Sequence, residues 1–354
     1  MEDRNDVLGM LDLMPRPGFC VKDGHILKVN QAAQSLCIRP GSGISQLLQT
    51  GTEEYAALGQ GALYLTLNLA GQPVEASVTR LGDLDVFLLE QDADDRELQA
   101  MALAARELRI PLSGVMATAQ RLFPMAGPEE DSQRQAARLN RGLYQMLRVL
   151  GNMSDAARGP EESHQETREL SSFFDEIFEK AQGYLSQAGL KLVYRGLGNP
   201  VYGLISEEQL ERAVLNILSN AIKFTPAGGT IQATLTRHSH FLRLSIQDNG
   251  CGMDAEVRRN LFSRYLRRPA IEDSRFGLGL GMVLIRSAAA SHGGTLLIDQ
   301  PEGSGTRVTL TVDLRRKPEP GLRSPILAVD YAGDWDHWLV ELSDSLPPDV
   351  YGRE

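Results

Sequence analysis

The stretch Val214-Leu-Asn-Ile-Leu-Ser-Asn-Ala-Ile-Lys-Phe-Thr-Pro226 decides the fold of the C-terminal half of this sequence. Apolar residues recur there at steps of four and three, which predicts an amphipathic helix. They are Leu210, Val214, Leu218 and Ala221. Ser206 and Gln209 form a capping-box pattern at its start, and Pro226 with the Gly228-Gly229 pair predicts its end.

A polar stripe runs along the same helix. Asn216, Asn220 and Lys223 lie four and three residues apart, so their side chains share one face. Two carboxamides and an ammonium group in this register can hold the water shell of a metal ion and phosphate oxygens. Solvated helix faces are also often rich in Asn and Lys, so an ordinary surface is the second interpretation.

Length and composition limit the class of protein. The 354 residues allow two or three domains, and a hydrophobic content of 42% is that of a globular protein. A net charge of −10 argues against a nucleic-acid-binding or membrane-binding surface. The three cysteines match neither a disulfide framework nor a metal site; they are Cys20, Cys37 and Cys251. Without a signal-like start or a membrane-length apolar run, the sequence predicts a cytoplasmic protein.

The N-terminal part, residues 1–93, reads as a small α+β unit. Asp23-Gly24 separates two short apolar runs, Gly18–Lys22 and His25–Val29, which predicts a β-hairpin. Residues 30–37 look helical, and strands are expected at 63–69, 73–79 and 84–89. The unit resembles a PAS sensory domain. A domain with a bound ligand and an unliganded dimerising module are both compatible with it.

Residues 94–160 carry two apolar seams of alternating three- and four-residue steps. The first comprises Leu98, Met101, Ala105, Leu108, Leu112, Val115, Ala119 and Leu122. The second comprises Ala136, Leu139, Leu143, Met146, Leu150, Met153 and Ala157. Pro124, Gly127 and Pro128 interrupt the pattern between them, which predicts a helical hairpin. A homodimer with a four-helix bundle would bury both seams; a monomeric hairpin packed on a neighbouring domain is the alternative.

Residues 168–316 show a mixed α/β pattern. Around the opening helix we expect a helix at 171–185, a helix at 280–290, and strands at 191–194, 230–236, 241–247, 295–298 and 307–312. Asp248 follows one of these strands directly and precedes Gly250 and Gly252. A carboxylate followed by glycines can recognise the amino group of a flat ring, although Asp-Asn-Gly is also a common turn.

A glycine-rich stretch precedes the last helix. It contains Gly277, Leu278, Gly279 and Gly281, and closely spaced glycines before a helix expose backbone N–H groups to phosphate. Between it and Asp248 lies an arginine-containing segment, residues 261–268, which suits a lid over a triphosphate. Each feature alone is weak, but the order of all four is specific.

Together these stretches resemble the GHKL ATPase superfamily and, within it, the sensor histidine kinases. The resemblance covers residues 168–316, including His292-Gly293-Gly294 and Gly303–Thr306, and implies a GHKL-type (Bergerat) α/β sandwich that binds ATP and Mg²⁺. It implies that Asn216 coordinates Mg²⁺, and that Asn220 and Lys223 contact the nucleotide and its phosphates. Arg267 would approach the γ-phosphate.

The resemblance also assigns the other wall of the site. Asp248 would accept a hydrogen bond from the adenine amino group, with Gly250 and Gly252 shaping that wall. The glycine-rich stretch would fold over the phosphates through Gly277, Leu278, Gly279 and Gly281.

The helical hairpin resembles the dimerisation and phosphoacceptor domain of the same kinases. Their signature is His followed by Glu-Leu-Arg-Thr-Pro-Leu, whereas this chain has Arg106 at the acceptor position and Ile110 in place of threonine. Arginine stays protonated and is no nucleophile at physiological pH. Glu107, the family's general base, keeps its position, but none of the six histidines lies on the hairpin.

The tail, residues 317–354, lies outside the kinase pattern. Residues 324–330 look extended, and 335–346 could form a short amphipathic helix with Trp338, Leu339 and Leu342 on one side. We expect it to dock on the body of the protein; a partner-binding element is the alternative.

Three functions are compatible with this multidomain α+β organisation. The first is a cytoplasmic homologue of sensor histidine kinases in two-component-type signalling that binds Mg-ATP but cannot autophosphorylate. It would be a pseudokinase acting as a homodimer, or with a response regulator or a complete histidine kinase. The second is a GHKL-type kinase that phosphorylates a partner protein. The third is a non-catalytic dimeric scaffold.

Overall fold

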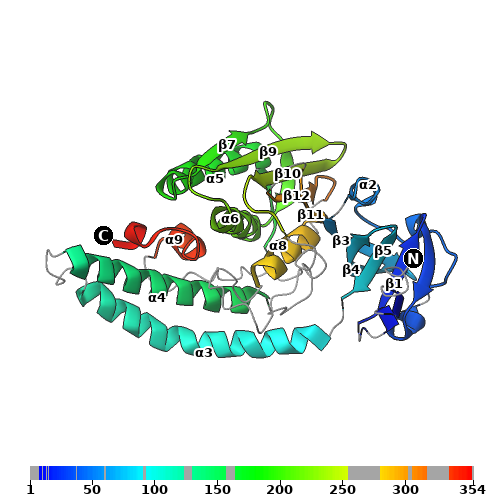
Figure 1. The fold of residues 1–354 in the computed structure, drawn as a ribbon, viewed down its shortest axis with the longest axis horizontal. Coiled ribbons are helices and arrows are strands. Elements are labelled where there is room, and N and C mark those ends of the chain that lie inside the picture. The colour runs from blue at the N-terminus through cyan, green and yellow to red at the C-terminus, as the bar shows by residue number, and fades with distance from the viewer. Residues whose placement is uncertain are drawn as a thin grey trace.

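The computed structural model describes most of the chain, in segments. They are residues 8–9, 11–12, 14, 16–36, 38–59, 61–90, 93–122, 130–156, 164–253, 280–301, 305–316 and 335–352. These segments form an N-terminal sheet domain, a long helical hairpin and a C-terminal α/β sandwich (Figure 1). This is the multidomain α+β architecture that the sequence predicts.

The N-terminal domain contains five antiparallel strands in the order β2-β1-β5-β4-β3. They are β1 (Gly18–Lys22), β2 (His25–Val29), β3 (Gly61–Leu69), β4 (Gln72–Leu81) and β5 (Leu84–Leu89). The predicted hairpin is confirmed: Asp23 and Gly24 take φ of 49° and 75°, as a two-residue turn between twisted strands requires. Residues expected as a helix at 30–37 form the shorter 3₁₀ turn η1 (Gln31–Leu36). Two further short helices are the 3₁₀ helix η2 (Ile44–Gln46) and the α-helix α2 (Thr52–Ala56).

The helical hairpin consists of α3 (Ala93–Leu122) and α4 (Glu130–Ala156). The break expected at Pro124, Gly127 and Pro128 lies outside the described residues. The predicted seams are only half right. Seam positions such as Ala105, Leu112 and Leu150 are buried, but others are more than half exposed, namely Leu108, Val115, Leu139 and Met146.

The difference arises because α4 packs on two sides. One face contacts α3, and another contacts elements of the C-terminal half, so Tyr144, Leu147 and Arg148 are buried in addition to part of the seam. Part of the hairpin is thus covered within one chain, as the monomeric alternative requires. The exposed seam residues leave an apolar strip on the outside of the hairpin.

The C-terminal sandwich has helices on one face of a sheet (Figure 1). Its strands are β7 (Lys191–Arg195), β9 (Thr230–His238), β10 (Phe241–Asp248), β11 (Leu296–Asp299) and β12 (Arg307–Asp313), with β6 (Glu166–Glu169) and β8 (Tyr202–Ile205) as a separate pair. The helices are α5 (Leu170–Gln187), α6 (Glu207–Phe224) and α8 (Leu280–Ser291). The sequence predicted each of these elements except β6 and β8.

The two sheets are joined edge to edge. Residues 61–64 of β3 pair antiparallel with residues 296–299 of β11, which makes one continuous ten-stranded sheet. An ion pair between Arg286 of α8 and Glu90 reinforces the junction, and the Arg286 guanidinium also lies 5.0 Å from the centre of the Tyr64 ring. The N-terminal domain is therefore attached directly to the helix that follows the glycine-rich stretch.

The start of α6 differs from the predicted capping box. Ser206 is the N-cap residue, but its side chain makes no capping hydrogen bond. Its backbone N–H donates instead to His292 Nε2 at 3.0 Å, while Gln209 Oε1 accepts from Ser291 Oγ. The ring of His292 therefore takes the place of the expected side-chain cap and ties α6 to the end of α8.

The last described segment, residues 335–352, contains α9 (His337–Glu341) and the turn η5 (Pro348–Gly352). It lies between α4 and α6 (Figure 1). The predicted helix is shorter than expected, and the predicted docking on the body is observed. Among the helices of the described ranges, none has the length and hydropathy that crossing a membrane requires.

Candidate functional site

Helix α6 is the platform of the candidate site. Its apolar stripe is buried as predicted, since Leu210, Val214 and Leu218 are inaccessible to solvent. Its polar face is not an ordinary solvated surface, because Asn216 is only 1% exposed. Asn220 and Lys223 are half-buried on the same face.

The carboxamide of Asn216 is held from both ends. Its Nδ2 donates to the backbone oxygen of Arg212 at 2.9 Å, which fixes the orientation of the amide group. Its Oδ1 accepts a hydrogen bond from Arg148 on α4 at 3.1 Å. The oxygen that a metal ion would need therefore points at the hairpin, in a fixed direction.

Lys223, in the last turn of α6, pairs with Asp344 of the C-terminal segment at 3.1 Å. Burial lowers the pKa of the Lys223 ammonium group, and the nearby Arg148 lowers it further. Burial alone would raise the pKa of Asp344, but Arg148 and Lys223 together bring it below its ordinary value. The Lys223 ammonium group thus faces the Asp344 carboxylate in this structure, in the way that it would face a phosphate group.

Asp248 lies at the end of β10 in a well-defined backbone cradle. Its Oδ1 accepts from the N–H of Gly250 at 2.8 Å and from the N–H of Thr306 at 3.2 Å. The residue is 6% exposed, and burial raises its pKa although both N–H groups oppose the shift. With both amides on Oδ1, the geometry leaves Oδ2 to accept a further hydrogen bond, as recognition of an amino group requires.

The glycines beside Asp248 are required by close packing. Gly252 has a φ of +71°, and a Cβ atom there would lie 2.9 Å from Gln300 Nε2. A Cβ atom at Gly250 would collide with the backbone carbonyl of Phe224 at the end of α6. The wall formed by Asp248, Gly250 and Gly252 is therefore pressed against the helix that carries Asn216 and Lys223.

Gly281, in the first turn of α8, closes the arrangement. A Cβ atom at this position would lie 2.7 Å from Asn216 Oδ1, so the backbone of α8 reaches the carboxamide. The other predicted members of this part of the site lie outside the described residues; they are Arg267, Gly277, Leu278 and Gly279.

The donor set fits a metal held mainly by phosphate. Within the described ranges, no group of three or more His, Cys, Asp and Glu side chains could hold an ion. Asn216 offers one neutral oxygen, and Mg²⁺ commonly takes one or two protein ligands together with phosphates and waters. An ion at Asn216 would have to arrive with a nucleotide and displace the hydrogen bond from Arg148.

The acceptor region of the hairpin is accessible. Arg106, Glu107 and Ile110 are exposed on α3, whereas Ala105 beside them is buried. The structure does not bring Arg106 or Glu107 together with Asn216, Lys223 and Asp248. An acceptor side chain at position 106 would project into solvent.

Four charged residues at the site were not identified from the sequence. Arg148 and Arg212 are both buried, and both meet Glu341 of α9, with Arg212 Nη2 at 3.0 Å from its carboxylate. The fourth is Asp344. One signal was available: Arg134, Arg141 and Arg148 repeat every seven residues, so they form a basic stripe along one face of α4.

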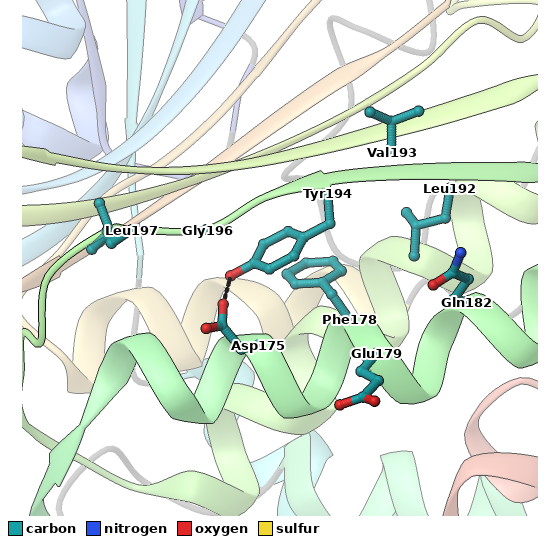
Figure 2. A pocket seen from close by; sticks show the side chains of 10 residues that line it. Asp175, Phe178, Glu179, Gln182, Leu192, Val193, Tyr194, Gly196 and Leu197 are labelled. Carbon is teal, nitrogen blue, oxygen red and sulfur yellow. Dashed lines mark hydrogen bonds between the residues drawn. The ribbon is translucent and has the colours of Figure 1, made fainter.

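A separate cavity of about 720 Å³ lies between α5 and β7 (Figure 2). Phe178 and Tyr194 stack within it at 4.4 Å between ring centres, and the Tyr194 hydroxyl donates to Asp175 at 2.7 Å. None of the predicted site residues lines this cavity.

Comparison with known proteins agrees with this geometry. Residues 205–316 match the family model for histidine kinase-, DNA gyrase B-, and HSP90-like ATPases. The chain is 27% identical over 235 residues to the sensor histidine kinase RppB of Synechocystis sp., a match that covers 63% of this chain and 50% of RppB. The chain spans about half the length of the curated relatives it matches.

Two solved structures are also similar. Full-length ShkA in complex with AMPPNP is 21% identical, with a TM-score of 0.49, over 60% of this chain and 45% of that chain. The histidine kinase ThkA in complex with the response regulator protein TrrA is 14% identical, with a TM-score of 0.45, over 85% of this chain and 96% of that chain. The chain is thus similar to sensor histidine kinases over part of its length, with the match to the ATPase family model at residues 205–316 and an α/β sheet domain N-terminal to that match.

Proposed function

We propose that this chain binds Mg-ATP between α6, Asp248 and α8, and acts in two-component-type signalling without phosphorylating its own hairpin. The observation that carries the proposal is the convergence of Asn216, Lys223, Asp248 and Gly281 in one place. The residues proposed as metal ligand, phosphate-binding cation and base-recognising carboxylate lie on two elements in contact, α6 and β10, and Gly281 of a third, α8, packs against Asn216.

The roles of the site residues follow from their surroundings. Asn216, with its amide fixed by the Arg212 carbonyl, presents Oδ1 to Mg²⁺. Asn220 and Lys223 contact the phosphates from the same helix face. Asp248 uses the free oxygen of its carboxylate for the adenine amino group, and the family resemblance adds Gly277, Leu278, Gly279 and Arg267 on the phosphate side.

The hairpin supports the loss of autophosphorylation. The acceptor position is exposed on α3, as a residue that must receive phosphate would be, but it holds Arg106. Residues 93–156 contain no histidine, so no other imidazole on the hairpin can replace it. Glu107 keeps the position of a general base without a proton to take.

The remaining surfaces suit a dimeric regulatory protein. The exposed apolar strip of Leu108, Val115, Leu139 and Met146 would be covered in a homodimer with a four-helix bundle. The N-terminal sheet domain, proposed as PAS-like, would act on the ATPase domain through the β3–β11 junction. A response regulator or a complete histidine kinase is the expected partner.

A second candidate is phosphate transfer to another protein. The same observation favours it, because the chain keeps the residues proposed to bind the nucleotide but has Arg106 in place of the acceptor histidine. The third candidate is a purely structural role, in which bound ATP stabilises one conformation of the chain.

Incubation of the purified chain with γ-labelled ATP tests the proposal. We expect no acid-labile, base-stable label on the wild-type protein, because phosphohistidine on the hairpin cannot form. Acid-stable label on an added partner would favour the second candidate. Acid-labile label on residues 93–156 of the wild-type chain would contradict the proposal.

A further inference from the structure

The C-terminal segment, defined here as residues 335–352, is anchored to α5 and α6 by an aromatic side chain. Trp338 is 2% exposed and stacks on Tyr184 of α5, with the ring centres 5.5 Å apart. Its Nε1 donates to Glu211 of α6 at 2.8 Å, and the Lys180 ammonium lies 4.9 Å from the ring centre. A buried tryptophan with its polar atom satisfied holds a segment firmly.

The opposite side of the segment is bound to α4. Arg141 donates to the backbone oxygens of Ser343 at 2.9 Å and Asp344 at 3.1 Å, and Asn140 donates to that of Tyr351 at 2.8 Å. The Tyr144 ring packs edge-on against Trp335. These contacts fix the backbone on both sides of Asp344, so the position of its carboxylate is determined by the docking of the whole segment.

The Asp344 carboxylate lies between two cations that come from different elements. Its Oδ2 accepts from Arg148 at 2.8 Å and from Lys223 at 3.1 Å. One anionic oxygen shared by a guanidinium and an ammonium group is the arrangement that a phosphate oxygen also makes. Lys223 is the residue that the proposed function assigns to the nucleotide phosphates.

Arg148 extends the same contact to the metal ligand. While one of its nitrogens holds Asp344, another donates to Asn216 Oδ1 at 3.1 Å. A guanidinium at this oxygen occupies the lone pair that Mg²⁺ would use and repels a divalent cation. The docked segment therefore blocks the phosphate contact directly and the metal contact through Arg148.

We propose that Asp344 is an internal competitor of the nucleotide phosphates, so that Mg-ATP binds only when the C-terminal segment leaves α6. This regulation rests on the proposed function, because it concerns the same Mg-ATP site. Release of the segment frees Lys223 for phosphate and lets Arg148 turn away from Asn216. Any partner that captures residues 335–352 would then raise the nucleotide affinity of the chain.

The test compares Mg-ATP affinity, by calorimetry, in full-length variants. Asp344→Asn removes the competing charge, and we expect the dissociation constant to fall about tenfold, the equivalent of one charge-assisted hydrogen bond. Trp338→Ala weakens the docking while keeping every charge near α6, and it should also tighten binding. Asp349→Asn, at an exposed carboxylate of the same segment, is the matched control and should bind as the wild type does.

Tryptophan fluorescence gives an independent readout. The sequence has two tryptophans, Trp335 and Trp338, and both lie in the C-terminal segment, so the emission reports its docking. Saturating Mg-ATP should shift the wild-type emission to the red. Unchanged emission at saturation would show that nucleotide and docked segment coexist, and would overturn the proposal.

The affinities separate the remaining outcomes. Equal binding by the wild type and Asp344→Asn overturns the competition but leaves the proposed Mg-ATP site intact. If Trp338→Ala tightens binding and Asp344→Asn does not, the segment blocks the site by bulk and the carboxylate is not the competitor. If no variant binds nucleotide, the proposed function fails, and the competition fails with it.

Discussion

Gly281 and Asn216 are so close that a Cβ atom on Gly281 would lie 2.7 Å from Asn216 Oδ1. The first turn of α8 and the polar face of α6 therefore meet at the oxygen proposed as the metal ligand. The glycine is needed for this approach rather than for an unusual φ angle. The contact links the glycine-rich stretch to the polar stripe in space as well as in sequence.

Replacing Gly281 with alanine is expected to push the Asn216 carboxamide out of position. Overpacking of this kind costs about 1–3 kcal/mol, so the free energy of unfolding in urea should fall by that amount. Mg-ATP affinity should fall as well.

Gly183→Ala is the control, since Gly183 lies on the exposed face of α5 with nothing near its Cβ position. Alanine is the better helix former, so this variant should gain roughly 0.5–1 kcal/mol. If the free energy of unfolding falls in both variants, crowding around Asn216 is not the cause of the destabilisation.

The second prediction concerns His292, whose buried ring joins α6 to α8. Burial lowers the pKa of His292 to about 4 from an ordinary 6.5, and its Nδ1 donates to the Ala288 carbonyl while Nε2 accepts from Ser206. Below pH 6.5 the unfolded chain takes up a proton that the folded chain excludes until about pH 4. The free energy of unfolding should therefore fall with pH across this window, by roughly 3 kcal/mol in total.

The measurement is urea unfolding at several pH values for the wild type and His292→Gln. Other groups titrate in both proteins, so the difference between the two curves isolates the histidine. The variant should be less stable at pH 7, and the gap should narrow as the pH falls toward 4. If the difference in free energy of unfolding between the two proteins does not change with pH, His292 does not contribute to the pH dependence of stability.

The third prediction concerns the junction of the two sheets. Glu90→Ala leaves the Arg286 guanidinium, 5% exposed, without its carboxylate partner. Loss of one member of a buried ion pair costs about 3–5 kcal/mol, so thermal unfolding should begin at a lower temperature and the N-terminal domain should be released to protease first.

Asp83→Ala breaks the exposed pair with Lys22 in the same domain and should change stability by less than about 1 kcal/mol. If the two substitutions lower the stability by the same amount, the junction of the two sheets does not depend on the ion pair of Arg286.

The fourth prediction restores the missing acceptor. Arg106→His places an imidazole at an exposed position of α3 next to Glu107. If the ATPase domain retains its chemistry, this variant should acquire acid-labile, base-stable label from γ-labelled ATP, most clearly in combination with Asp344→Asn. Arg106→Gln is the control and should stay unlabelled. Label of equal strength in both would place the acceptor elsewhere.

The long helices, the strands of the ten-stranded sheet and the direction of the polar stripe could be predicted because they follow from local periodicity, whereas α2, β6 and β8 were missed. The places of Asn216 and Lys223 on one helix and of Asp248 at the end of a strand could be predicted in the same way, while their roles stay predictions. The capping box at Ser206 was wrong because a tertiary neighbour, the ring of His292, satisfies the helix start better than the local side chain.

The partners of the site residues could not be predicted. Lys223 and Asp344 are 121 positions apart in the sequence, and no periodic pattern relates a helix face to a carboxylate in a distant turn. The hairpin seam failed for a similar reason. Heptad rules assume that a helix has one packed face, whereas α4 has two, one against α3 and one against η5, α8 and α9.

Binding of Mg-ATP to the full-length chain, measured by calorimetry into the millimolar range, tests the central claim most directly. We predict one nucleotide per chain, binding that requires Mg²⁺, loss of binding in Asp248→Ala and in Asn216→Ala, and unchanged binding in Arg106→Ala. Absence of binding in the wild type and in Asp344→Asn, or binding that survives Asp248→Ala unchanged, would contradict it.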